Sequence, residues 1–158
     1  MRTSSASSAK EGRRVYLIDT NVISEARKKS NANAGVIEFF RREASAGEPL
    51  FLSVVTVGEL RRGIELVRVR GDTEQARWLE DWLRVVLDEY GDKVLRFDAD
   101  AAQVWGRLRV PNPDHALDKQ IAAIALVHGL TVVTRNAADF HGTGVNVLNP
   151  FVPKAPAR

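Results

Sequence analysis

Short apolar runs alternate along the chain with longer segments in which apolar residues recur at helical spacing. The run VYLI at 15–18 is the first and is typical of a buried strand. The predicted strands cover 15–18, 50–54, 94–97, 130–134 and 145–148. The predicted helices cover 20–29, 34–45, 56–68, 72–90, 99–109 and 117–128, with a short helical turn at 136–140.

Strands that alternate with helices predict an α/β sandwich whose central sheet is mainly parallel and has four to five strands. In such sheets, ligands bind beyond the carboxyl ends of the strands. Polar residues that directly follow a predicted strand are therefore the first candidates for a functional site.

The length of 158 residues predicts one domain, which we place at 13–151. Residues 1–12 are small and polar and are expected to form a disordered tail, and 152–158 a flexible C-terminal end. The tail lacks the apolar stretch of about seven residues that a signal peptide needs. No apolar run approaches the roughly 18 residues of a membrane span, so we expect no membrane partner.

The composition excludes some chemistry and permits other kinds. The chain has no cysteine, which excludes disulfides and thiolate metal sites and fits a reducing compartment, so we expect a cytoplasmic protein. The net charge of +3 permits nucleic-acid binding without requiring it. The stretch Arg61–Arg70 carries four arginines that could follow an RNA backbone, or form a solvated face paired with Glu65. Trp78 and Trp82 share one helix face, which favours packing over base stacking.

Two aspartates occupy positions from which they could take part in a site. Asp19 ends the run VYLID and stands at the carboxyl end of the first predicted strand. Asp118 shares a helix face with the apolar residues Ile121, Ala122 and Ala125. Each also has a structural explanation, because Asp19 can cap the following helix and Asp118 can complement a helix dipole. The dipole accounts for the helical turn of Asp118 but not for its apolar face.

Glu59 and Asp139 have structural explanations too. Thr56 and Glu59 fit a capping box at the start of a helix, with the hydroxyl and the carboxylate satisfying each other's backbone donors. Asn136 can cap a short turn in which Asp139 holds the third position. Taken singly, neither carboxylate requires a function.

The predicted positions of the four carboxylates, taken together, favour a shared site. Asp19, Glu59 and Asp139 follow three predicted strands and meet at one edge if those strands are neighbours, whereas Asp118 must reach that edge from the start of its helix. Carboxylates gathered in one crevice repel each other, and a divalent cation relieves the repulsion. Oxygen ligands suit Mg²⁺ or Mn²⁺ rather than zinc, and such a metal can hold water and a phosphate for phosphodiester cleavage. The three histidines are too scattered for a histidine metal triad.

Four blocks of sequence, in this order and spacing, resemble PIN-domain proteins, and more closely the VapC-like ribonuclease toxins of type II toxin–antitoxin systems, in the FitB-like subgroup. The resemblance covers about 14–151. The blocks are YLIDTNVISE (16–25), SVVTVGEL (53–60), LDKQIAAIALVHGLTVVTRNAADF (117–140) and VLNPF (147–151).

The resemblance implies a PIN-like three-layer α/β/α sandwich and an endoribonuclease that depends on Mg²⁺ or Mn²⁺. The family's acidic positions correspond to Asp19, Glu59, Asp118 and Asp139. Of these, Asp19 and Asp118 match the two positions usually credited with holding the metal.

The resemblance also implies substrate contacts and partners. Thr134 and Asn136 match a polar pair that lines the pocket, and Thr20 follows Asp19 closely enough to touch a scissile phosphate. The implied partners are an RNA substrate, a cognate antitoxin and a second copy in a homodimer. We expect an antitoxin segment to lie between Gly58–Arg70 and the helix 72–90, where an arginine could enter the acidic pocket in place of the metal.

Other readings of the sequence are weaker. A PIN-like binding module without catalysis is the main alternative, and the intact set of four carboxylates argues against it. A receiver or phosphohydrolase domain would need a lysine after the fourth strand, which is absent. No G-x-x-x-x-G-K-[ST] motif occurs, which excludes a P-loop enzyme.

Overall fold

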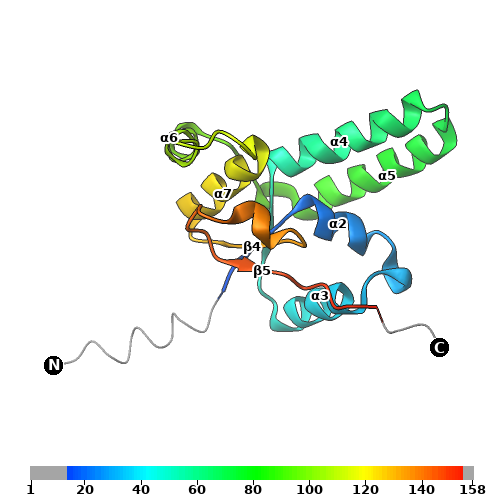
Figure 1. Ribbon diagram of the computed structural model, residues 1–158. Coiled ribbons are helices and arrows are strands. Elements are labelled where there is room, and N and C mark those ends of the chain that lie inside the picture. Colours follow the sequence, from blue (N-terminus) through cyan, green and yellow to red (C-terminus); the bar gives the residue numbers. More distant parts are fainter. Residues whose placement is uncertain (1–13, 155–158) are drawn as a thin grey trace.

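A five-stranded parallel sheet forms the centre of the computed structural model, which describes residues 14–154 (Figure 1). The strand order is β3-β2-β1-β4-β5, so β1 is central and its neighbours are the strands that the convergence of carboxylates requires. The predicted parallel sheet is therefore confirmed. Its strands are β1 (Tyr16–Ile18), β2 (Leu50–Ser53), β3 (Val94–Leu95), β4 (Thr131–Val133) and β5 (Val147–Leu148).

Helices cover both faces of the sheet, and the α4–α5 hairpin projects well beyond it (Figure 1). The α-helices of the described part are α2 (Thr20–Ala26), α3 (Ala34–Ala46), α4 (Val54–Val69), α5 (Thr73–Tyr90), α6 (Ala99–Leu108) and α7 (Ala116–His128). Short 3-10 helices lie at η1 (Lys29–Asn31), η2 (Gly91–Lys93) and η3 (Ala137–Phe140).

Side-chain alternation along the strands creates two apolar cores. Ile18 and Val133 point to the face covered by α2, α3, α4 and α5. Leu17 and Val132, one residue earlier in each strand, point to the face covered by α6 and α7. Both faces are buried, as expected for a parallel sheet. The result is the predicted three-layer α/β/α sandwich.

The start of α4 differs from the prediction. The helix begins at Val54, two residues before the predicted start, because the buried Ser53 caps it by accepting a hydrogen bond from the Thr56 N–H (3.1 Å). The capping box that the sequence suggested for Thr56 and Glu59 is therefore wrong. Since Ser53 performs the capping, the Glu59 carboxylate is available for other contacts.

The basic stretch of α4 takes part in ion pairs with the neighbouring helix. Arg61 and Arg68 both contact Glu80 of α5, at 2.7 and 3.2 Å, and both also pair with Glu65. This supports the interpretation of a solvated, paired face for these two arginines. Packing of the tryptophans holds for Trp82, which packs against the core of that face. The predicted packing is wrong for Trp78, which is 51% exposed.

The predicted tail at 1–12 lies outside the described residues, as does the end of the predicted C-terminal segment from 155 onward. The part that is described is attached to the domain. The Asn33 side chain accepts a hydrogen bond from the Val152 N–H (3.0 Å) and donates one to the Val152 carbonyl (2.8 Å). Within 14–154, no helix has the length and hydropathy to cross a membrane.

Gly35 is the point at which the C-terminal segment crosses the start of α3. A Cβ atom on Gly35 would lie far inside the normal contact distance of the Pro150 carbonyl oxygen. The crossing therefore requires a residue without a side chain.

We predict that Gly35→Ala destabilises the protein by about 1–3 kcal/mol, because the backbone must shift to relieve the clash. Gly106→Ala is the matched control, since a Cβ at this exposed position of α6 meets no atom within 4 Å. That control should stabilise the protein by about 0.4–1 kcal/mol. Urea unfolding measures both changes, and equal stabilities of Gly35→Ala and the parent protein would contradict the crowding.

Candidate active site

Asp19 is the buried centre of the candidate site. It follows β1 directly and is 5% exposed. Its carboxylate accepts three hydrogen bonds: from the Thr20 N–H at 2.8 Å, the Thr134 hydroxyl at 2.7 Å and the Asn21 amide at 3.3 Å. Asp19 is also the N-cap of α2, so the capping interpretation is confirmed for this residue, and capping is compatible with a role in the site.

Thr134 links the ends of the two central strands. This fully buried residue follows β4, and its hydroxyl donates to Asp19 while accepting from the Asn136 N–H (3.1 Å). Asn21 adds a second link, because its amide donates to both Asp19 and Thr134 and its carbonyl accepts from the Arg135 N–H (2.9 Å). These bonds fix the orientation of the Asp19 carboxylate.

Glu59 lies on α4, and its carboxylate contacts Thr20, the residue that follows Asp19. The Thr20 hydroxyl lies 3.2 Å from a carboxylate oxygen of Glu59 and 3.3 Å from the Thr56 hydroxyl. Thr20 therefore lies between the acidic residues that follow β1 and β2.

Asp118 and Asp139 reach the same edge from α7 and η3. Both lie beside His115, whose Nδ1 is 3.5 Å from an Asp118 oxygen and 3.9 Å from an Asp139 oxygen. One ligand atom of each of these three residues falls within a common span of 4.8 Å. The start of α7 therefore does lie at the rim, which the predicted parallel sheet alone could not guarantee.

Repulsion and burial raise the pKa values of three of the carboxyl groups. Burial is the largest cause of the raised pKa at Asp19, Glu59 and Asp118. The charge of Asp19 raises the pKa of both Glu59 and Asp118, and Asp139 acts in the same direction on Asp19 and Asp118. The four carboxylates therefore share one electrostatic environment, as their positions in the sequence suggested.

This donor set fits a divalent cation. Carboxylate oxygens are preferred ligands of Mg²⁺ and Mn²⁺, and a cation would offset the repulsion that raises the pKa values.

The other candidates differ in how they join the site. Thr20 and Thr134 contact its carboxylates directly, whereas Asn136 is exposed and contributes through its backbone. The expected side-chain cap by Asn136 on η3 is not formed, and its carbonyl instead accepts from the Asp139 N–H (3.0 Å). Sequence reasoning missed Asn21 and His115. The position of Asn21, two residues after a strand, was a usable signal.

The fold and this acidic edge define a class of protein with known members. The sequence model of the PIN-domain family matches residues 16–144, so the chain belongs to the PIN-domain family. The expected family is thus confirmed.

The chain is similar over most of its length to three curated proteins. It is 38% identical to the plasmid stability protein StbB of Pseudomonas syringae pv. tomato, over 87% of this chain and 99% of that protein. It is 33% identical to toxin FitB of Neisseria gonorrhoeae, with the same coverage. It is 32% identical to VapC ribonuclease Y4jK of Sinorhizobium fredii, over 88% and 99%.

A solved structure has the same fold. The crystal structure of FitAcB from Neisseria gonorrhoeae matches with a TM-score of 0.73 and 32% identity, covering 86% of this chain and 98% of that one.

The raised pKa values make a prediction about stability without metal. The folded chain holds protons on these carboxyls more tightly than the unfolded chain, whose values lie near 3.8 for Asp and 4.5 for Glu. Stability conferred by the protonated groups is therefore lost as the pH rises through the raised pKa values.

In EDTA, the melting temperature of the parent protein should fall more between pH 4 and pH 8 than that of Asp118→Asn. The expected difference is about 2–4 °C, the change that about 1 kcal/mol produces at this chain length. Adding Mn²⁺ should stabilise the parent protein and leave the variant nearly unchanged. Parallel pH profiles of the two proteins in EDTA would contradict the shared repulsion.

Proposed function

We propose that this chain is a metal-dependent endoribonuclease that acts as the toxin of a toxin–antitoxin pair. The observation that carries the proposal is the convergence of four carboxylates on the carboxyl edge of the sheet, where burial and neighbouring charges raise the pKa of Asp19, Glu59 and Asp118. The names of the relatives support the substrate and the biological role, since one is a ribonuclease and another a toxin.

In this proposal Asp19 and Asp118 hold the cation, and Glu59 and Asp139 complete the acidic pocket. When bound, Mg²⁺ or Mn²⁺ supplies activation of a water molecule and offsets charge on the phosphate. The chain supplies orientation. Each Asp19 oxygen has two lone pairs, and Oδ1 accepts only one hydrogen bond within the described residues, which leaves a lone pair for the metal.

The remaining polar residues position the carboxylates and the substrate. Thr134 keeps Asp19 in one orientation through its hydroxyl, so its role is positioning. Thr20 holds Glu59 in the same way and lies close enough to the pocket to meet the RNA. The exposed Asn136 side chain is available to a substrate phosphate or sugar.

Asp118→Asn should lower RNA cleavage at least about 10²-fold, the loss typical of removing one stabilising charge or donor from an active site. Asp81→Asn is the control, because Asp81 is exposed on α5 and, within 14–154, pairs with Arg84 alone. The assay follows cleavage of labelled single-stranded RNA with Mg²⁺ or Mn²⁺ and with EDTA. Cleavage that survives EDTA, or a fully active Asp118→Asn, would refute the mechanism.

The proposed antitoxin site is a groove between α2, α4 and α5. It encloses about 300 Å³ and is lined by residues that include Thr20, Glu59, Gly63 and Trp82. The groove therefore opens onto the acidic pocket, which allows a partner segment to bring an arginine to the carboxylates. A guanidinium matches paired carboxylates through two parallel hydrogen bonds. The proposal includes a homodimer, as the family resemblance implies.

Gly63→Trp should weaken antitoxin binding at least about tenfold, because a Cβ at this position meets no atom within 4 Å and a large side chain would fill the groove. Gly63 lies one helical turn after Glu59, so metal-dependent cleavage is measured on the same variant, and antitoxin binding should fall more than cleavage. Co-expression with the product of the adjacent gene, followed by light scattering, measures both the complex and the dimer. An unchanged complex would place the antitoxin elsewhere.

A further inference from the structure

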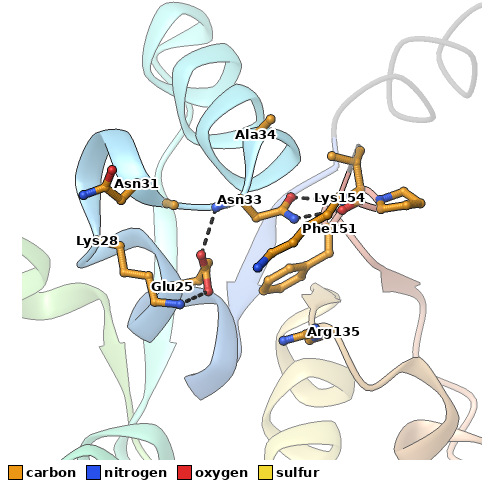
Figure 2. Close-up of a pocket in the computed structure, with 11 residues that line it drawn as sticks. Glu25, Lys28, Asn31, Asn33, Ala34, Arg135, Phe151 and Lys154 are labelled. Carbon is orange, nitrogen blue, oxygen red and sulfur yellow. Dashed lines mark hydrogen bonds and ion pairs between the residues drawn. The ribbon is translucent and has the colours of Figure 1, made fainter. Parts of the chain in front are cut away.

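A second cavity lies on the other side of α2 from the groove. It encloses about 540 Å³ between the end of α2, η1, the start of α3 and the C-terminal segment (Figure 2). Lysine and arginine side chains from three separate parts of the chain line it. We call it the cationic pocket and define it by Glu25, Lys28, Asn33, Arg135, Phe151 and Lys154.

The charge of the cationic pocket favours an anion. Its three cations face a single carboxylate, Glu25 (Figure 2), whose pKa is lowered mainly by the hydrogen bond from Lys28 and also by the charge of Arg135. Glu25 is already engaged by the Lys28 ammonium (2.9 Å) and the Asn33 N–H (2.9 Å). Within 14–154, Arg135 and Lys154 form no ion pair.

Arg135 is held in place before any ligand arrives. Its guanidinium lies 4.9 Å from the centre of the Phe151 ring, and the backbone N–H of Arg135 donates to the Asn21 side-chain carbonyl. The segment that carries Phe151 is fixed in turn by the two hydrogen bonds between Asn33 and Val152. A guanidinium fixed in this way loses little freedom on binding and presents its donors to a phosphate.

The cationic pocket is adjacent to the acidic site. Arg135 stands between Thr134 and Asn136, and the same Asn21 side chain that accepts from its N–H donates to Asp19. A strand of RNA whose scissile phosphate lies at the carboxylates therefore carries its neighbouring phosphates toward Arg135.

We propose that the cationic pocket binds the phosphate backbone of the RNA strand beside the cleavage site, with Arg135 as the main contact. The proposal rests on the nuclease function proposed above and adds where the substrate leaves the active site. Phosphate contacts position a nucleic acid without reading its sequence, so this pocket sets the register of the strand.

The test measures RNA binding separately from cleavage. In an Asp118→Asn background with EDTA, fluorescence anisotropy gives the affinity for a labelled single-stranded RNA at several salt concentrations. Arg135→Gln should weaken binding about tenfold and lower the slope of log K against log[salt] by about 0.7, the change for one lost phosphate contact on a single strand. Arg135→Lys should restore the salt slope and part of the affinity. Arg84→Gln, which removes an exposed cation of α5, should change neither.

Cleavage by proteins with intact Asp118 separates the possible failures. Arg135→Gln should raise KM about tenfold with a much smaller change in kcat, because the residue binds a flanking phosphate. A large loss of kcat with unchanged KM would overturn the assignment by placing Arg135 at the reacting phosphate. Unchanged binding and cleavage would overturn the pocket and leave the nuclease intact. If Arg135→Gln bound and cleaved RNA like the parent protein but no longer formed the antitoxin complex, the pocket would be assigned to a protein partner instead. Absence of any RNA binding or cleavage by the parent protein would instead refute the nuclease.

Discussion

The buried carboxylate of Asp19 is the feature on which the rest of the site depends. A charge that is 5% exposed at the end of a central strand is costly, and it persists because Thr20, Asn21 and Thr134 donate hydrogen bonds to it. Two of these donors follow β1 and the third follows β4, so the carboxylate also ties together the ends of neighbouring strands. The same hydrogen bonds therefore orient Asp19 and align the ends of β1 and β4.

The positions of the other carboxylates are electrostatically unfavourable in the absence of a metal. Burial together with the charge of Asp19 raises the pKa of Glu59 and of Asp118, so the metal-free fold carries unfavourable energy at neutral pH. The apolar cores on both faces of the sheet compensate for this. Carboxyl groups in one cleft whose pKa values are raised by burial and by neighbouring charges are candidates for a functional site.

The sequence was sufficient wherever a residue's position follows from local pattern. The ends of the predicted strands identified Asp19 and predicted that Glu59 and Asp139 lie near it. The parallel sheet was predicted from the alternation of strands and helices. His115 was not predictable, because it lies in a loop without periodicity. That loop is held near the site by the buried Lys119, which donates to the Asn112 carbonyl, and by the left-handed backbone of His115 (φ 57°).

Helix α2 gives the site two unlike sides. Its Thr20 and Ser24 line the groove beside Glu59, whose walls include Leu60, Ile64 and Trp82, whereas its Glu25 lines the cationic pocket. An apolar wall suits a protein segment, and a cationic wall suits a nucleic-acid backbone. A partner in the groove and an RNA strand in the cationic pocket would therefore meet only at the carboxylates. Inhibition would then require competition for the acidic centre alone, without displacement of the flanking RNA contacts.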